Sequence, residues 1–130
     1  MPHLTMEYSA NLAARTDMQG LAEVVLDALL QTGLFEVGAV RVRAIECAAY
    51  AIADRHPDNA FLDMSLRVGE GRSAEEKKRA GDAIFAAVSQ QLSPLFEAPH
   101  FALSFEIREI DPALSWKSNA MHGRLRGRQS

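Results

Sequence analysis

The chain has 130 residues, which is the size of one domain with one hydrophobic core and excludes two independent catalytic domains. Its hydrophobic share of 48% and charged share of 24% are typical of globular proteins and exclude a disordered chain. Lys and Arg number 14 against 17 Asp and Glu, but three arginines (Arg124, Arg126 and Arg128) lie near the C-terminus, so the rest holds 11 basic against 17 acidic residues. This acidic body excludes nucleic acid as the main partner, and any bound anion needs individually placed arginines.

The cysteine and hydropathy patterns indicate the compartment. Cys47 is the only cysteine, so no disulfide can form within the chain, and no Cys/His set has metal-ligand spacing. No stretch approaches the roughly 20 apolar residues of a membrane span, since Asp27 interrupts the run 24–30, and residues 1–5 lack the basic start of a signal peptide. We therefore expect a cytoplasmic protein with no metal and no membrane partner.

The first half of the chain predicts a strand, a helix and a second strand. Apolar and polar residues alternate over 3–8, which is the period of a half-buried strand. Thr16-Asp17-Met18-Gln19 has the Thr-x-x-Gln form of a capping box, and Gly33 marks the end of the helix that it begins. One face of this helix carries Leu21, Val24, Val25, Ala28 and Leu29. Alternation returns from Val40 to about Cys47 and predicts the second strand.

The second half repeats this order after a connection over 48–59. Alternation over 61–68 predicts a third strand, and alternation over 101–108 predicts a fourth. Between them, Ser73-Ala74-Glu75-Glu76 is a capping box, and Pro94 is expected to bend or end the helix that follows. The apolar stripe of this helix is Ala80, Ile84, Ala87, Val88, Leu92 and Leu95.

The repeat predicts an α+β fold made of two joined βαβ units. We expect a single domain with one unit at about 2–47, the other at about 60–110, and a C-terminal interface segment and tail over 111–130. Two such units join into a four-stranded sheet with both helices on one face. The opposite face, which carries Thr5, Ser65, Ala102 and Ser104, would then lie against other subunits, so we expect a symmetric oligomer.

Pro2 is a candidate general base. It follows Met1 directly, and a small second residue generally allows removal of the initiator methionine, which would leave a secondary amine. An N-terminal amine has a pKa of about 7.7–8.0, and apolar surroundings and nearby cations lower that pKa further. Such an amine could accept a proton at pH 7 and return it as an acid. The alternative is that Met1-Pro2 merely begins the chain.

Arg41 and Arg72 are candidate anion-binding residues. Arg41 lies on the polar side of the second strand, and Arg72 precedes a capping box at a helix N-terminus, where backbone N–H groups favour an anion. Two guanidinium forks suit a dicarboxylate, or an acid with an adjacent carbonyl. Either arginine could equally be a solvated surface group, and Arg15 and Arg43 share this ambiguity.

These residues resemble motifs of the tautomerase superfamily. Two arginine-bearing motifs of 4-oxalocrotonate tautomerase are similar to Glu70-Gly71-Arg72-Ser73 with Glu76-Lys77 and to Val40-Arg41-Val42, and Met1-Pro2 supplies the superfamily's amino-terminal proline. Within the superfamily, the chain resembles the 5-carboxymethyl-2-hydroxymuconate isomerase family from Pro2 to His122. The matching positions are Pro2-His3, Glu7, Gly33-x-Phe35, Gly38, Arg41-x-Arg43, Asp54, 69–73, 102–107, Pro112-x-Leu114, Lys117-x-Asn119 and His122.

The resemblance implies a homotrimer that needs no cofactor and acts in the degradation of homoprotocatechuate, which derives from 4-hydroxyphenylacetate. It implies isomerisation of 5-carboxymethyl-2-hydroxymuconate, a dienol triacid, to 5-oxopent-3-ene-1,2,5-tricarboxylate. Pro2 would take the 2-hydroxyl proton and deliver one to carbon 5, while Arg41 and Arg72 would bind carboxylates and stabilise charge on the 2-oxygen. Alignment with the short subunit of 4-oxalocrotonate tautomerase places Leu62 where the second unit would carry a proline, so we expect one site per chain.

Other polar residues have weaker claims. His3 adjoins Pro2 and could contact substrate, although a surface strand position would explain it equally well. His122 and Trp116 are expected to pack against a neighbouring subunit. The sequence Arg124-x-Arg126-x-Arg128 departs from the family pattern and is expected to form a flexible tail.

Two other functions stay open at this point. One is a tautomerase for another 2-hydroxydienoate or a phenylpyruvate-like acid, because two arginines do not determine how many carboxylates the substrate has. The other is a non-catalytic trimeric acid-binding module, which would result if Met1 is retained, because the Pro2 nitrogen would then be an amide and could not accept a proton.

Overall fold

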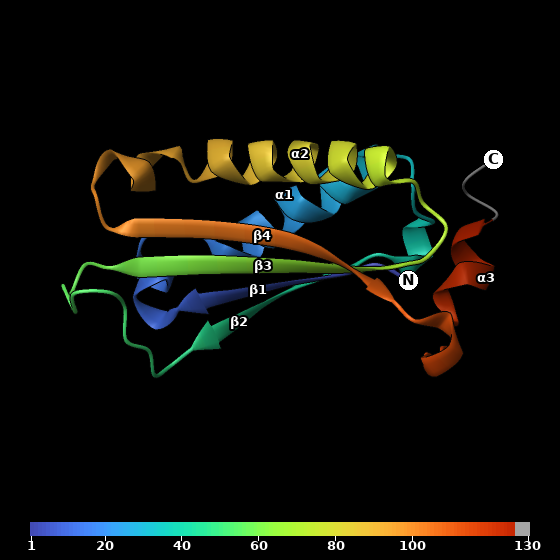
Figure 1. The fold of residues 1–130 in the computed structure, drawn as a ribbon, viewed down its shortest axis with the longest axis horizontal. Coiled ribbons are helices and arrows are strands. Elements are labelled where there is room, and N and C mark those ends of the chain that lie inside the picture. The colour runs from blue at the N-terminus through green and yellow to red at the C-terminus, as the bar shows by residue number, and fades with distance from the viewer. Residues whose placement is uncertain (127–130) are drawn as a thin grey trace.

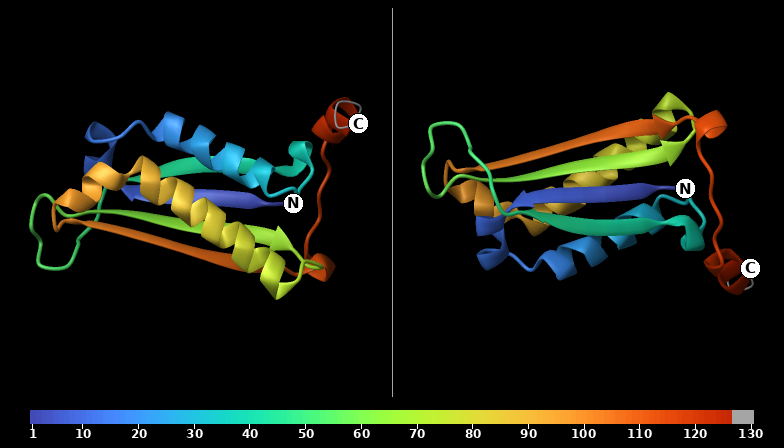
Figure 2. Two further views of the ribbon diagram at one scale, coloured as in Figure 1. Left: turned by 90° about the horizontal axis from the view of Figure 1, so that it is seen from above. Right: turned by 90° about the horizontal axis from the view of Figure 1, so that it is seen from below.

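Four strands form one sheet, and two long helices cover one of its faces (Figures 1 and 2). The computed structural model describes residues 1–126. The strands are β1 (His3–Ser9), β2 (Arg41–Cys47), β3 (Ala60–Gly69) and β4 (Phe101–Ile110), and the helices are α1 (Met18–Gln31), α2 (Ala74–Gln91) and the short α3 (Met121–Leu125). Short 3₁₀ turns are η1 (Ala10–Ala14), η2 (Val37–Ala39), η3 (Ser93–Glu97) and η4 (Pro112–Leu114). The α+β order expected from the repeat is confirmed.

The sheet order β2-β1-β3-β4 results from joining two βαβ units side by side. β1 pairs with β2 in parallel, and β3 pairs with β4 in parallel, whereas the two central strands β1 and β3 are antiparallel. The two units therefore begin at opposite ends of the sheet. In this register His3 lies opposite Arg41 on one side and opposite Arg67 on the other.

The hydrophobic core lies between the sheet and the two long helices. Alternate residues of the central strands are fully buried because one face of the pleat points toward the helices. These core residues are Leu4 and Met6 of β1, Leu62, Met64 and Leu66 of β3, Leu21, Val25 and Leu29 of α1, and Ile84 and Val88 of α2. Each large apolar side chain buried in this way stabilises the fold by about 1.5–3 kcal/mol relative to its exposed state.

The helix N-termini confirm one of the two expected capping boxes. At α2, the Ser73 hydroxyl accepts a hydrogen bond from the Glu76 N–H, and the Glu76 carboxylate accepts one from the Ser73 N–H, both at 3.0 Å. At α1, the expected Thr16 capping box is wrong. Asp17 is the N-cap, and its carboxylate accepts the Gly20 N–H at 3.0 Å, so the helix begins one residue later than a Thr16 cap would require, and aspartate is at least as strong a cap as threonine.

The helix C-termini agree with the sequence signals. Gly33 follows α1 with φ of +72°, a left-handed conformation that favours glycine. α2 ends at Gln91, before Pro94, which lies in the first turn of η3. Leu92 continues the buried stripe although it lies beyond the α-helix proper.

The C-terminal segment crosses the sheet end and packs α3 against η2 (Figures 1 and 2). The expectation of a flexible arginine tail is wrong for Arg124 and Arg126, which lie within α3 and at its C-cap, and Arg128 lies outside the described residues. The sheet face opposite the helices is uncovered and polar, with Thr5 and Ser65 half-exposed at its centre. Over residues 1–126, no helix combines the length and apolar character needed to cross a bilayer.

Candidate active site

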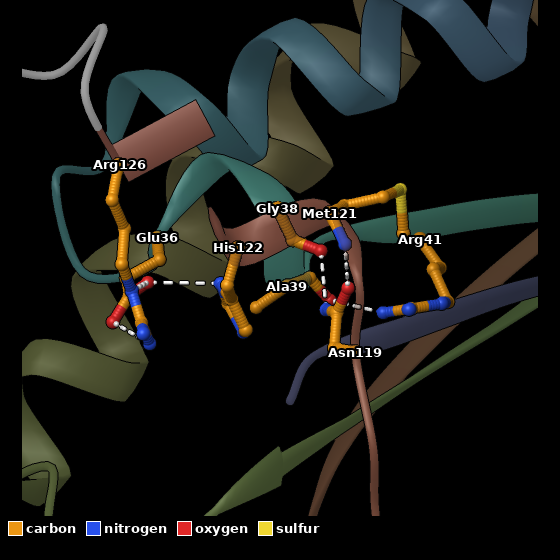
Figure 3. A network of polar contacts seen from close by, with 8 residues as sticks. All are labelled: Glu36, Gly38, Ala39, Arg41, Asn119, Met121, His122 and Arg126. Atoms are coloured by element: carbon orange, nitrogen blue, oxygen red, sulfur yellow. Dashed lines mark hydrogen bonds and ion pairs between the residues drawn. The ribbon is translucent and has the colours of Figure 1, made fainter. Parts of the chain in front are cut away.

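Pro2 and Arg41 lie beside each other at the start of the parallel β1/β2 pair. Pro2 is buried, and its carbonyl oxygen accepts a hydrogen bond from the Arg41 N–H at 3.2 Å. The Arg41 side chain turns back along the chain, and its Nη1 donates to the carbonyl oxygen of Ala39 at 2.9 Å (Figure 3). The backbone hydrogen bond thus holds Pro2 next to Arg41, and the bond to Ala39 holds the Arg41 guanidinium.

Arg72 is brought to the same end of the sheet by the turn between β3 and α2. Its Nη1 donates to the Gly69 carbonyl at 3.2 Å, and its Nη2 donates to the Leu34 carbonyl at 3.0 Å. The guanidinium carbon lies 4.6 Å from the centre of the Phe35 ring, within cation–π distance. Among the described residues, the buried Nε has no hydrogen-bond partner. Two carbonyl groups and the Phe35 ring therefore orient the Arg72 guanidinium, which has more N–H groups than these contacts use.

The predicted site residues line two adjoining pockets with Met1 between them. A pocket of about 340 Å³ is lined by Pro2, Arg72 and Phe35 among others. A second pocket of about 600 Å³ is lined by His3 and Arg41 among others. Met1 and Lys117 line both pockets. The structure thus gathers Pro2, His3, Arg41 and Arg72 around the N-terminus, where Met1 lies at the edge of both pockets.

The N-terminal amine has the electrostatic environment expected of a base that works near neutral pH. Burial lowers the pKa of the Met1 amine, and the positive charges of Lys117, Arg72 and Arg41 lower it further. No carboxylate is among the groups that shift this pKa. The same cations would face an amine at Pro2, one residue further into the site.

His3 is held as a neutral imidazole. Burial lowers its pKa, as do the charges of Arg67, Arg43 and Arg41. Arg43 Nη1 lies 3.4 Å from His3 Nδ1, and because a guanidinium can only donate, Nδ1 is the acceptor. His3 therefore offers a neutral polar ring at the mouth of the second pocket.

A strap over residues 115–126, not expected to contribute to the site, forms one wall of it (Figure 3). Asn119 anchors this strap, because its Nδ2 donates to the Gly38 carbonyl at 2.7 Å and its Oδ1 accepts the Met121 N–H at 2.9 Å. Gly38 allows the close approach, since a Cβ there would lie 3.1 Å from His122 Nδ1. Lys117 precedes this anchor and points its charge toward the N-terminal amine.

Contacts with Glu36 hold the last residues of the strap in place. Arg126 donates to both carboxylate oxygens of Glu36, at 2.8 and 3.2 Å, and His122 Nδ1 lies 2.9 Å from Glu36 Oε2 (Figure 3). The hydrogen bond from Arg126, together with the charges of Arg126 and His122, lowers the pKa of the Glu36 carboxyl. Within its own chain, His122 thus packs against Glu36, and its expected contact with a neighbouring subunit stays a prediction. Lys117, Asn119 and His122 could have been found from the sequence, because they belong to the family motif Lys117-x-Asn119 with His122. No sequence motif indicated Glu36 or Arg126.

The second βαβ unit has no counterpart of Pro2. Leu62 is internal and fully buried in β3.

At the end of the sheet opposite the N-terminus, the ligand atoms of His56, Asp58 and His100 lie within 4.8 Å of one another, a grouping that the sequence spacing did not indicate. His56 Nδ1 already accepts the Asp58 N–H at 3.1 Å, and the His56 and His100 rings stack at 4.0 Å, so these contacts account for the grouping as part of the loop.

Comparisons with known proteins agree on one family. A model of the 5-carboxymethyl-2-hydroxymuconate isomerase family matches residues 2–125. An Escherichia coli protein named 5-carboxymethyl-2-hydroxymuconate Delta-isomerase is 36% identical over 122 residues, which cover 94% of this chain and 97% of that protein. The crystal structure of a 5-carboxymethyl-2-hydroxymuconate isomerase from Deinococcus radiodurans R1 is 39% identical with a TM-score of 0.89, and covers 95% of this chain and 92% of that one. A structure described as a fused 4-OT symmetric trimer, 21% identical with a TM-score of 0.62 over 93% of this chain and 98% of its own, shares the fold.

Proposed function

Because the chain belongs to the 5-carboxymethyl-2-hydroxymuconate isomerase family, we propose that it isomerises 5-carboxymethyl-2-hydroxymuconate to 5-oxopent-3-ene-1,2,5-tricarboxylate. The observation that carries this proposal is the position of Pro2, which is buried just before β1 and next to the Met1 amine, on which the charges of Arg41, Arg72 and Lys117 act. The family supports a place in homoprotocatechuate degradation.

Pro2 acts as the acid and base once Met1 is removed. Removal converts the Pro2 nitrogen from an amide into a secondary amine, and it takes away a residue that lines both pockets. The amine takes the 2-hydroxyl proton, the electron pairs shift to give the 2-oxo group and a C3=C4 double bond, and carbon 5 receives the proton from the amine. The reaction balances with this one proton, so the proposed step requires no cofactor.

Arg41 and Arg72 bind carboxylates and stabilise the charge that develops on the 2-oxygen. Arg72 is oriented by two carbonyl groups and the Phe35 ring, so little conformational freedom is lost when it binds an anion. Charge stabilisation by fixed donors is worth about 10²–10³ in kcat for each donor. His3 is a weaker candidate for a substrate contact.

We also propose that the protein is a homotrimer. The uncovered polar face of the sheet and the exposed apolar side chains of the C-terminal segment support this. Trp116 is 86% exposed and Leu114 is 72% exposed, which is costly for a monomer in water. The segment 111–130 then acts as the interface segment, although residues 127–130 lie outside the described part of the chain.

The proposal is tested by turnover and intact mass together. The processed chain, whose mass lacks Met1, should convert the triacid, whereas a chain with a Gly-Ser extension ahead of Pro2 should lose about 10²–10⁴-fold in kcat. A matched control carries the same extension after the C-terminus and should keep its activity. In a second comparison, Arg41→Gln and Arg72→Gln should lower kcat/KM, whereas Arg79→Gln, an exposed arginine of α2, should not. Full activity in the extended chain would overturn the role of Pro2.

The alternative substrate is a 2-hydroxydienoate with two carboxylates. Two arginines beside Pro2 would match such a diacid as well as a triacid. If the processed chain turns over 2-hydroxymuconate as well as or better than the triacid, the narrower assignment is wrong.

A further inference from the structure

The larger of the two pockets beside Met1 holds cations with no carboxylate to balance them. We call it the cationic pocket, and its charged or ionisable side chains are His3, Arg41, Arg67 and Lys117. No Asp or Glu is among its lining residues in the described part of the chain. This is unexpected in a protein whose acidic residues outnumber its basic ones.

These cations are also unpaired outside the pocket. Within residues 1–126, the ion pairs involve Lys77, Lys78, Arg108, His122 and Arg126, and none involves Arg41, Arg67 or Lys117. The contrast with Arg108 is direct, because Arg108 lies opposite Arg67 on the next strand and yet pairs with Glu106 at 2.6 Å.

The pairing of the strands places these cations close together. His3 is the cross-strand neighbour of both Arg41 and Arg67, so the two arginines flank it on adjacent strands that are about 4.8 Å apart. Lys117 approaches from the strap. Like charges so close repel one another unless an anion lies between them, so the arrangement favours a bound anion.

The proposed substrate has three carboxylates, one more than the number of arginines assigned to it so far, Arg41 and Arg72. Its third carboxylate is that of the carboxymethyl branch, which 2-hydroxymuconate lacks. Resting on the proposed function, we infer that Arg67 and Lys117 bind this branch carboxylate and thereby make the site selective for a triacid. Arg67 and Lys117 are then specificity residues, and the proton transfer itself stays with Pro2.

The test compares two substrates across matched variants. Arg67→Gln and Lys117→Met should each lower kcat/KM for the triacid by about 10- to 100-fold, the value of one charged hydrogen bond. For 2-hydroxymuconate, the same variants should change kcat/KM less than about threefold when each is compared at pH values above its acid limb, where the amine is fully deprotonated. Arg79→Gln and Lys78→Met serve as controls, because each removes an exposed charge of α2 outside the pocket, and they should leave the preference unchanged.

The other outcomes are also decisive. Equal losses on both substrates, or no loss on either, would overturn the assignment of Arg67 and Lys117. Arg67→Lys keeps a positive charge and should show part of the triacid preference that Arg67→Gln loses. If Arg67→Gln lost the preference only because its folding is damaged, restoring the charge would not restore the preference. If the processed wild-type chain turns over neither substrate, the proposed function fails, and calorimetry with tricarballylate decides the inference separately. Weaker binding to Arg67→Gln than to Arg79→Gln then supports a carboxylate site, and equal or absent binding overturns it.

Discussion

At the scale of single residues, the site depends on one amine and the cations around it. Pro2, Arg41 and Arg72 could be proposed from the sequence because each has a local signal: a proline after Met1, an arginine in an alternating strand, and an arginine before a capping box. Lys117 could not be placed in the same way. It is an exposed lysine in an irregular segment, and only the path of the chain after β4 brings it to the N-terminus.

Replacing Lys117 should change the pH dependence of the reaction. The Lys117 charge lowers the pKa of the Met1 amine, and the same charge would face the Pro2 amine of the processed chain, so Lys117→Met should raise the pKa of that amine. The amine is a base only above its pKa, so the acid limb of the kcat/KM profile should move to higher pH in the variant. The profile is measured with 2-hydroxymuconate, whose binding does not need Lys117. Lys78→Met, which removes a charge paired with Asp82, should leave the limb in place, and an unmoved limb in Lys117→Met would contradict the prediction.

At the scale of elements, the sequence signals were reliable where they were local. Strand alternation and the Ser73 capping box depend on neighbours within one element, and both are confirmed. The α1 cap was wrong because Thr16 and Asp17 are both good caps, and spacing alone does not choose between them. The contact between Glu36 and Arg126 could not be predicted, since it joins residues 90 positions apart on surfaces with no periodic pattern.

The docking of α3 on η2 should depend on the missing side chain of Gly38. Gly38→Ala would place a Cβ 3.1 Å from His122 Nδ1 and 3.3 Å from the His122 backbone nitrogen, so the strap should move outward. We expect faster proteolysis within 115–126 and a loss of about 1–3 kcal/mol in the free energy of unfolding.

The matched control for Gly38→Ala is Gly123→Ala. A Cβ at Gly123 would meet no atom within 4 Å, and alanine favours a helix by about 1 kcal/mol over glycine, so this variant should keep or improve stability. Chemical denaturation and limited proteolysis measure both effects. Equal protease resistance in the two variants would show that Gly38 does not hold the strap.

At the scale of the whole molecule, the internal repeat was enough to predict the sheet and the placement of the helices. Two βαβ units with apolar helices can bury those helices only on a common sheet face, and the structure has this arrangement. The place of Met1 at the edge of both pockets could not be predicted, because it depends on how β1, the turn after β3 and the strap pack around the N-terminus.

The open sheet face gives a test of the proposed trimer. Ser65 lies at its centre, opposite Thr5 on β1 and Glu106 on β4. Ser65→Arg should place a large charge in the subunit interface and reduce the mass in solution from that of a trimer to that of a monomer. Light scattering after size-exclusion chromatography measures the mass. Ala86→Arg, at an exposed position of α2, should stay trimeric, and a trimeric Ser65→Arg would argue against this face as the interface.

The antiparallel pairing of β1 with β3 has a practical consequence for attaching a dye, a surface anchor or a fused protein. The N-terminus and the strap lie at one end of the sheet, and the loop over 48–59 lies at the other (Figures 1 and 2). A bulky group at the first end would block Pro2 or crowd α3. The loop over 48–59 is mostly exposed and joins the two units far from that chemistry, so it is the position where cargo can be carried without obstructing the entrance used by substrate.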